Sequence, residues 1–210
     1  MPFDHAITEE SLRSIYREPH PLVLRKVVDR VDGEAAAFIA ASPFVVVSTH
    51  GRRGADASPR GGPPGFVTVL DEHRLAIGDL AGNNRLDTIS NIVENGEIGL
   101  IFLVPGVEET VRVNGRATVT TDPEICARAA IDGRVPKAAI GVDVEACFLH
   151  CAKAFRRSGL WEPASWLAAD DRPSGACVIV EHLALEATPE QVEADLEAGY
   201  VATLWEVGGR

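Results

Sequence analysis

The sequence contains no long apolar run, and no stretch approaches the roughly twenty residues that a membrane-spanning helix needs. Its first residues include Asp4, Glu9 and Glu10 and no apolar core, which does not match a secretory signal peptide. Basic residues are also few, since 20 Lys and Arg stand against 31 Asp and Glu, and they form no basic stripe. We therefore expect a cytoplasmic protein that binds neither a membrane nor nucleic acid.

Cysteines are few as well, and their spacing does not suggest a disulfide framework. Cys126, Cys147, Cys151 and Cys177 are spread along the chain, as is typical of reduced, mostly buried thiols in a cytosolic protein. A metal site formed by Cys147, His150 and Cys151 is the alternative. No second pair follows at zinc-finger spacing, and a structural zinc needs four ligands, so we expect no metal.

The sequence also lacks a dinucleotide-binding fingerprint, internal repeats and low-complexity segments. Short strands at close intervals, with few helices between them, favour an antiparallel barrel with peripheral helices over a parallel βαβ sheet. A chain of 210 residues can bury one sizeable core, so we predict a single, mainly β domain of the α+β class over residues 1–210. We expect N-terminal helices over about 7–41 and a C-terminal helical tail over about 186–210.

Hydrophobic patterning gives the approximate order of the elements. A strand is predicted at 44–49, and after a turn a second strand runs through Ala57. Further strands are predicted at 66–70, 74–77, 98–104, 110–119 and 138–144. Helices are predicted at 9–16, at a segment ending near Ala40, and at 124–130, 145–155 and 189–198, with a short strand or packing arm at 200–205. The segment 61–65 is rich in glycine and proline, which weaken a central strand, and we interpret it as a shaped loop beside a ligand.

The segment from Gly78 to Arg85 indicates an anion-binding loop. It follows a short apolar strand and precedes an amphipathic helix with apolar positions at Leu86, Ile89, Ile92 and Val93. An Asn at the helix start can cap orphan amides, and the helix dipole favours a phosphate there. Arg85 adds a planar donor fork at the same place. A capped surface helix with a solvated arginine explains this segment alone equally well.

Three further segments accompany this loop: Asp56 to Phe66, Pro105 to Arg116, and His150 to Phe155. Together with the loop they resemble the pyridoxamine 5'-phosphate oxidase-like flavoproteins, a family of FMN-binding split barrels. The order of elements also fits, and Glu109 to Gly115 stands where that family has a strand resembling Arg-Gln-Val-Arg-Val-x-Gly. The resemblance covers about Ala36 to Trp161.

This resemblance implies an antiparallel split β-barrel with peripheral helices that binds FMN. Family members are typically homodimers with two FMN molecules at the interface, each touching both chains, and the same is expected here. The implied activity is that of an FMN-dependent oxidoreductase acting on a small organic substrate or electron acceptor. The chemistry belongs to the cofactor, so no catalytic side chain is identified.

The resemblance also implies which residues contact the cofactor. Asn83, Asn84 and Arg85 match the Ser-Arg-Lys phosphate loop, with Arg85 keeping the charge of the lysine. Ser58 and Arg60 match the strand that supplies further phosphate and ribityl contacts. Glu109 and Thr110 occupy the position of an Arg-Gln pair that faces the isoalloxazine ring, and Glu109 is expected to pair with Arg112 or point away.

Three further cofactor contacts are expected at Arg112, Lys153 and Trp161. Arg112 alternates with valines on a strand, and we expect it at the cofactor, whereas Arg116 belongs to the solvated face. Lys153 equally fits a surface lysine near a helix end, and Trp161 equally fits interface packing. His150 is more typical of a satisfied core histidine than of a proton donor.

Other members of the class remain open as alternatives. The chain lacks the substrate-side Arg-Gln pattern and the basic C-terminal motif of pyridoxamine phosphate oxidase itself, so that activity is not expected. Related split barrels bind a deazaflavin or haem, and a non-catalytic flavin-binding or flavin-sensing protein would have the same sequence features. The electron donor is not identified by the sequence.

Overall fold

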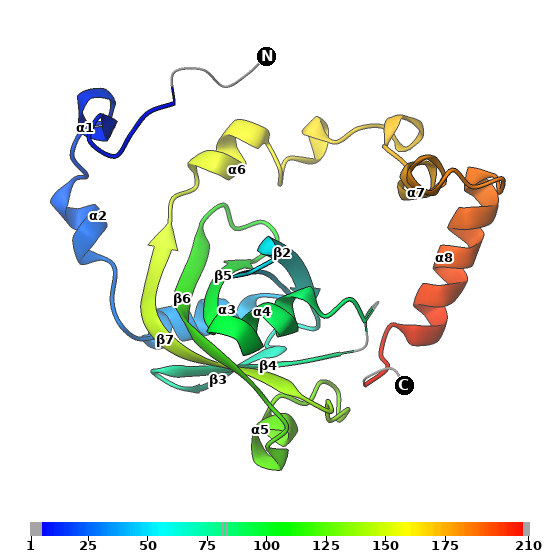
Figure 1. The fold of residues 1–210 in the computed structure, drawn as a ribbon. Helices are drawn as coiled ribbons and strands as arrows, with labels where there is room; N and C mark the ends of the chain where they lie inside the picture. The colour runs from blue at the N-terminus through cyan, green and yellow to red at the C-terminus, as the bar shows by residue number, and fades with distance from the viewer. Residues whose placement is uncertain (1–5, 81, 83, 208–210) are drawn as a thin grey trace.

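The computed structural model describes residues 6–80, 82 and 84–207. Its centre is a seven-stranded antiparallel sheet in the order β2-β1-β5-β6-β7-β4-β3, and the sheet is not closed (Figure 1). The strands are β1 (Phe44–Gly51), β2 (Gly54–Gly61), β3 (Val67–Asp71), β4 (Arg74–Gly78), β5 (Glu97–Leu103), β6 (Thr110–Thr120) and β7 (Ala139–His150). The architecture is therefore α+β with the split-barrel type of sheet that the sequence predicts.

Buried and exposed side chains alternate along the strands, so one face of the sheet carries the core. In β1, Val45 and Val47 are fully buried while Ser48 and His50 point outwards. Leu100 and Phe102 repeat this pattern in β5, and Val113 does so in β6. The buried faces meet inside the curved sheet and form a single main hydrophobic cluster.

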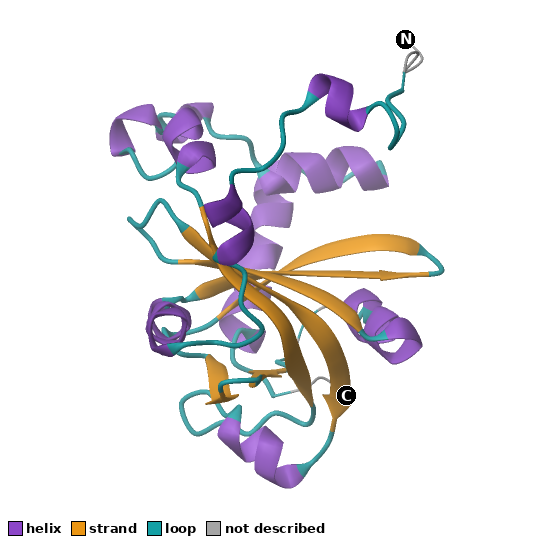
Figure 2. Ribbon diagram, turned by 90° about the vertical axis from the view of Figure 1, so that its left-hand side faces the viewer, coloured by secondary structure: helices purple, strands orange, loops and turns teal. Residues whose placement is uncertain are grey.

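The long strands β6 and β7 join the two halves of the sheet, and their pairing shifts register between Asn114 and Gly115. A glycine is required there, because a Cβ on Gly115 would lie 2.0 Å from the backbone oxygen of Asp143. The bulge increases the local twist and allows the sheet to curve, which Figure 2 shows from the side.

Three helices pack on the sheet: α3 (Gly33–Ala41), α4 (Asp87–Asn95) and α5 (Pro123–Arg128). The carboxylate of Asp32 accepts a hydrogen bond from the Ala35 amide and caps α3. Helix α4 lies against β1, where Ile92 is buried and the Asn91 side chain donates to Thr49 Oγ1 at 3.1 Å. This packing fixes the N-terminal end of α4 beside β2.

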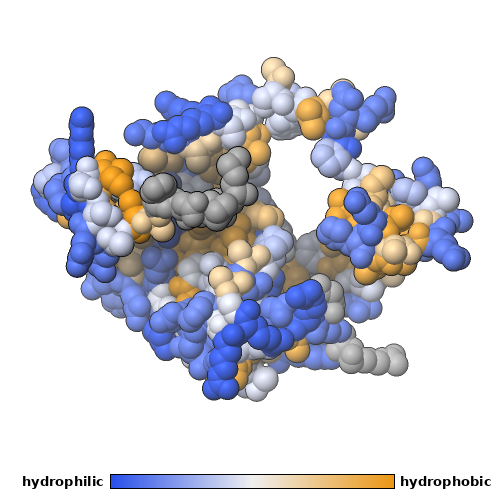
Figure 3. Space-filling view, turned by 45° about the horizontal axis from the view of Figure 1, so that its top comes forward, coloured by the Kyte–Doolittle hydropathy of each residue, from blue (hydrophilic) through white to orange (hydrophobic). Residues whose placement is uncertain are grey.

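Two helical arms flank this body. The N-terminal arm contains α1 (Leu12–Ile15) and α2 (Pro21–Arg25), and the C-terminal arm contains α6 (Lys153–Ser158), the 3-10 turns Pro163–Ser165 and Ala169–Asp171, α7 (Gly175–Leu183) and α8 (Pro189–Thr203). The C-terminal arm curves away from the sheet, and an opening separates it from the body in Figure 3. Large apolar side chains on both arms are exposed.

Some predicted elements were wrong. Residues 145–150 continue β7 and do not form a helix, because they pair with β6 and bury Cys147, so α6 begins only at Lys153. Strand β2 extends to Gly61 and contains Pro59, which an edge strand tolerates because it needs no ladder donor on its outer side. The end of the chain continues α8 to Thr203 and forms no strand in the described residues. No described helix has the length and apolar character required to cross a membrane.

Candidate functional site

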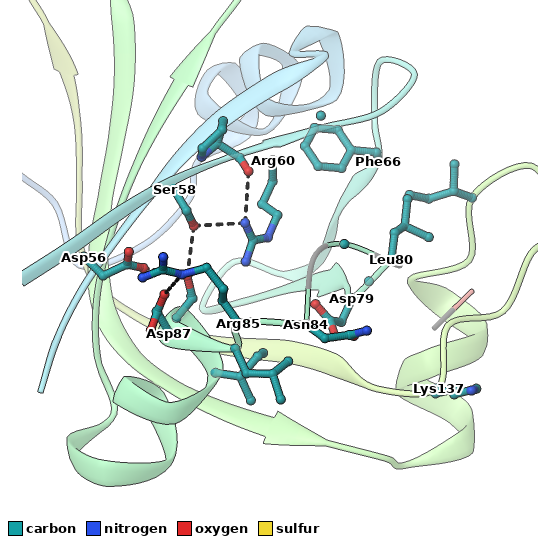
Figure 4. A pocket seen from close by; sticks show the side chains of 18 of the residues that line it. Asp56, Ser58, Arg60, Phe66, Asp79, Leu80, Asn84, Arg85, Asp87 and Lys137 are labelled. Carbon is teal, nitrogen blue, oxygen red and sulfur yellow. Dashed lines mark hydrogen bonds and ion pairs between the residues drawn. The ribbon is translucent and has the colours of Figure 1, made fainter. Parts of the chain in front are cut away.

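A cavity of about 730 Å³ lies where β2, the start of α4 and the end of α8 come together (Figure 4). Its volume falls in the range of small-molecule and cofactor sites. The lining residues come from segments that are far apart in the sequence: Asp56, Ser58, Pro59, Arg60, Gly61, Phe66, Gly78, Asp79, Leu80, Gly82, Asn84, Arg85, Leu86, Asp87, Thr88, Ile89, Ile131, Lys137 and Leu204.

Strand β2 supplies three polar groups to the cavity. Asp56, Ser58 and Arg60 alternate along β2 and are half-buried, so they share one face of the strand. The Arg60 Nη1 donates to Ser58 Oγ at 2.9 Å, and Ser58 Oγ lies 2.9 Å from Thr88 Oγ1. Because Thr88 donates its hydroxyl proton to Asp56 at 2.8 Å, Ser58 must be the donor to Thr88. A directed chain of hydrogen bonds therefore runs from Arg60 to Asp56.

Arg85 stands beside this chain, held by a carboxylate of its own segment. Its Nε donates to the Asp87 Oδ2 at 2.8 Å, and this hydrogen bond raises the pKa of the guanidinium. Asp87 also lies 3.9 Å from an Arg53 nitrogen. The carboxylate of Asp87 fixes the direction of the Arg85 fork, which reaches the same end of the cavity as Arg60 (Figure 4).

The predicted asparagine cap of α4 was wrong. Helix α4 begins at Asp87, its cap position is Leu86 with φ of 58°, and no side chain caps it. Asn84 also has a left-handed backbone, with φ of 57°. Two left-handed residues around Arg85 turn the chain and delay the helix, and the acidic Asp87 then meets the positive end of the dipole. Asn83 lies outside the described residues.

Asp79 brings a further carboxyl group to the cavity. Its burial raises the pKa of this carboxyl above the ordinary value, and the nearby Arg60 guanidinium acts in the opposite direction. Asp56 accepts a hydrogen bond from Thr88, and Asp87 accepts one from Arg85, so the charges of both carboxylates are partly compensated. The cavity thus combines cationic and anionic groups, with the two arginines at one end.

This end of the cavity fits a phosphate ester. Two guanidinium groups provide directed donors, and the hydroxyls of Ser58 and Thr88 lie beside them. Phe66, Leu80, Ile131 and Leu204 also line the cavity and offer apolar surface to a ring. Figure 4 shows Phe66 beside Arg60, with Leu80 and the cationic Lys137 farther from Arg85. A molecule with a phosphate at one end and a planar ring at the other matches this distribution of polar and apolar groups.

The other predicted cofactor contacts do not line this cavity. Arg112 lines a second cavity of about 580 Å³ on the outer face of β1, β5 and β6. Its guanidinium lies 5.1 Å from the centre of the Phe148 ring, and its buried Nε has no hydrogen-bond partner among the described residues. Thr110 is buried at the start of β6. Neither residue reaches the first cavity from within the same subunit.

Lys153 and Trp161 belong to the beginning of the C-terminal arm. Lys153 is the exposed first residue of α6. The Trp161 Nε1 donates to the Val107 oxygen at 2.9 Å, and its ring stacks on Phe155 with centroids 5.6 Å apart. These contacts hold the arm on the β5–β6 hairpin. A role at a cofactor therefore requires the site of a second subunit, and it stays a prediction.

The cysteine and histidine segment has separate surroundings. Cys147 is buried on β7, and burial raises the pKa of its thiol to about 11. Cys151 and His150 are exposed at the end of that strand. Within the described residues, no three His, Cys, Asp or Glu side chains are grouped as metal ligands.

Sequence reasoning did not assign Asp56, Asp79, Thr88, Lys137 or Leu204 to the site, although all of them line the cavity. The position of Asp56 could have been inferred, because side chains alternate along a strand and Asp56 therefore shares a face with Ser58 and Arg60. Thr88 and Leu204 carry no local signal, because only the packing of α4 and α8 brings them to the cavity.

Comparison with known proteins adds a family match. The family model for pyridoxamine 5'-phosphate oxidase matches residues 31–151. None of the curated proteins matches the chain significantly. Among solved structures, HupZ of Group A Streptococcus is 21% identical, with a TM-score of 0.45, over 57% of this chain and 93% of that one.

Two solved structures from Clostridium acetobutylicum are also similar. One is a protein related to general stress protein 26 of B. subtilis, from the pyridoxinephosphate oxidase family. It is 14% identical over 56% of this chain and 85% of that one, with a TM-score of 0.44. The other is a NimC/NimA family protein, 12% identical over 56% of this chain and 91% of that one, with a TM-score of 0.40.

Proposed function

This chain belongs to the pyridoxamine 5'-phosphate oxidase family, and we propose that it is an FMN-dependent oxidoreductase that acts on a small organic molecule. The family is one of flavin-binding split barrels. The observation that carries the proposal is the convergence of Arg60 and Arg85 with two hydroxyls in a cavity that is also lined by apolar side chains.

Arg60 and Arg85 would hold the phosphate of FMN. Arg60 still has donors beyond those it gives to Ser58 and Pro59, and the Asp87 contact directs Arg85. Ser58 and Thr88 would position Arg60 and accept or donate hydrogen bonds beside the phosphate. Asp56 accepts a hydrogen bond from Thr88, which partly compensates the negative charge of its carboxylate.

The remaining lining residues would surround the flavin ring. Phe66, Leu80 and Ile131 would pack against the ring and exclude water from it, which would strengthen polar contacts nearby. Asp79 offers a further hydrogen-bond acceptor in the cavity. The bound FMN supplies the electron-transfer chemistry, so the protein contributes binding, orientation and exclusion of water.

A homodimer is part of this proposal, since proteins of this family are generally dimeric. The exposed apolar residues of the two arms support an extensive contact with a second copy. In the proposed dimer, Arg112, Lys153 and Trp161 of one subunit approach the cavity of the other.

The cofactor is tested by the absorption spectrum of the purified protein and the mass of the ligand released on denaturation. The proposal predicts the two-band visible spectrum of an oxidised flavin and the mass of FMN. A Soret band would indicate haem in place of FMN, and the mass of a deazaflavin would indicate that cofactor instead. A colourless protein that takes up no added FMN would contradict the proposal.

Light scattering tests the assembly. We expect a dimer in dilute solution, stabilised further by FMN, because a ligand that contacts both subunits favours the assembled state. A monomer that binds FMN stoichiometrically would rule out the shared site.

A further inference from the structure

The end of the C-terminal arm forms part of the wall of the cavity. Leu204 lies just beyond α8 and is the one lining residue that comes from outside the matched family region 31–151 in the described cavity. It lines the cavity together with the apolar side chains of Phe66, Leu80 and Ile131. The wall of the cavity is therefore completed by a segment that the shared fold does not provide.

The neighbouring Trp205 fastens this end of the arm to the body. The guanidinium carbon of Arg134 lies 5.8 Å from the centre of the Trp205 ring, a cation–π contact. Arg134 ends a tight turn that is closed by two backbone hydrogen bonds with Ile131, of 2.9 and 3.1 Å. Asp132 and Gly133 have positive φ in this turn. The turn that supplies Ile131 to the cavity wall thus also supplies the anchor for Trp205.

The hairpin formed by α7 and α8 is stabilised mainly by contacts within the hairpin. Its two helices pack on each other, and a capping box between Thr188 and Gln191 fixes the start of α8. Figure 1 shows α8 running back from α7 towards the loop before α4. Among the described helices and strands, α8 packs extensively on α7 alone, so we expect that a local change at Arg134 can release Leu204 without unfolding the sheet.

We propose that Leu204, held in place by the Arg134–Trp205 contact, is a specificity-determining residue that limits the size of the apolar molecule reaching the ring end of the cavity. This inference rests on the proposed function, because the ring end is defined by a phosphate at Arg60 and Arg85. The molecule admitted beside the ring is small and uncharged on the side that meets Phe66, Ile131 and Leu204.

The first test measures the anchor in the protein without flavin. Hydrogen–deuterium exchange of amides 199–207 should be at least threefold faster in Arg134→Gln than in the wild type. Arg128→Gln is the control, since Arg128 lies on α5 and donates to the Leu70 oxygen. Unchanged exchange in Arg134→Gln would overturn the proposal, whether or not the protein binds FMN.

The second test measures size selection in the protein loaded with FMN. Chemically reduced bound flavin passes two electrons and two protons to a quinone, which becomes the quinol, and the rate is compared for 1,4-benzoquinone and the bulkier menadione. Leu204→Ala should raise the menadione-to-benzoquinone rate ratio at least fivefold. Val201→Ala is the control, because Val201 is 77% exposed in the last turn of α8, just before Leu204, and does not line the cavity.

The two tests separate this inference from the proposed function. An unchanged rate ratio in Leu204→Ala would remove Leu204 as a size determinant while leaving FMN binding intact. A protein that takes up no FMN would contradict the proposed function, and the exchange experiment would still decide whether the Arg134 anchor exists.

Discussion

The hydroxyl oxygens of Ser58 and Thr88 lie 2.9 Å apart although thirty residues separate them in the chain. This contact ties the edge strand β2 to the first turn of α4 and places Arg60 beside the start of the helix. The part of the cavity at Arg60 and Arg85 thus depends on the packing of β2 against α4, two elements that are connected by two strands and a loop (Figure 4).

Replacing Thr88 by Val should destabilise the protein by about 1–3 kcal/mol, because the Asp56 carboxylate and the Ser58 hydroxyl both lose a buried partner. Thr88 is 3% exposed, so water does not readily replace the lost contacts. Urea unfolding measures the change. Thr68→Val is the control, since the Thr68 hydroxyl donates to the Arg128 oxygen near the surface and should cost less. Equal effects of the two substitutions would contradict a buried network.

Replacing Asp79 by Asn should change how stability depends on pH. Burial raises the pKa of Asp79, so the folded state holds this proton more tightly than the unfolded state. The wild type therefore loses stability as pH rises from the ordinary carboxyl pKa through the raised value, and Asp79→Asn should not show this loss. The difference between the two proteins should disappear at low pH, where the carboxyl is protonated in both states.

The same substitution should strengthen FMN binding by up to about tenfold at neutral pH, because it removes a negative charge from the cavity that takes the phosphate. Thermal unfolding across the pH range and fluorescence titration with FMN provide the two measurements. Weaker FMN binding by Asp79→Asn would instead show that the carboxylate accepts a hydrogen bond from the bound flavin.

The family resemblance, and not a local pattern, pointed to Ser58 and Arg60, since the predicted strand ended at Ala57 whereas β2 runs to Gly61. The helix that follows Arg85 was predicted from its apolar spacing, and α4 begins there at Asp87. Ile92 is buried as that spacing requires, whereas Val93 is 74% exposed.

The sequence did not predict what depends on contacts between distant segments. Residues 145–150 have a helical pattern, but pairing with β6 makes them a strand. Leu204 lines the cavity and the adjacent Trp205 contacts Arg134, and no local pattern in α8 indicates either contact. The start of α4 was missed because left-handed residues at Asn84 and Leu86 delay the helix.

Replacing Lys153 by Met should lower the reduction potential of the bound flavin. This effect should be larger than the effect on the affinity of the protein for FMN. In the proposed dimer this exposed lysine approaches the flavin of the second subunit, where a positive charge stabilises the reduced, negatively charged ring. A potentiometric titration measures the effect. Arg157→Met on the same helix is the matched control. Equal potentials in the wild type and both variants would mean that α6 serves only to hold the arm.

The central claim is that Arg60 and Arg85 bind the phosphate of FMN, and the most direct test compares FMN with riboflavin, which lacks the phosphate. Equilibrium titration of the wild type should show tighter binding of FMN. Arg60→Ala and Arg85→Ala should each reduce the affinity for FMN about 10- to 100-fold and leave the affinity for riboflavin nearly unchanged.

Arg52→Ala is the control for this titration, because Arg52 forms its 2.9 Å ion pair with Glu94 at the opposite end of the same helix. It should bind both ligands as the wild type does. The ratio of the affinity for FMN to the affinity for riboflavin should fall only when Arg60 or Arg85 is replaced. Equal affinity of the wild type for FMN and riboflavin, or an equal loss of both ligands in Arg60→Ala and Arg85→Ala, would contradict the central claim.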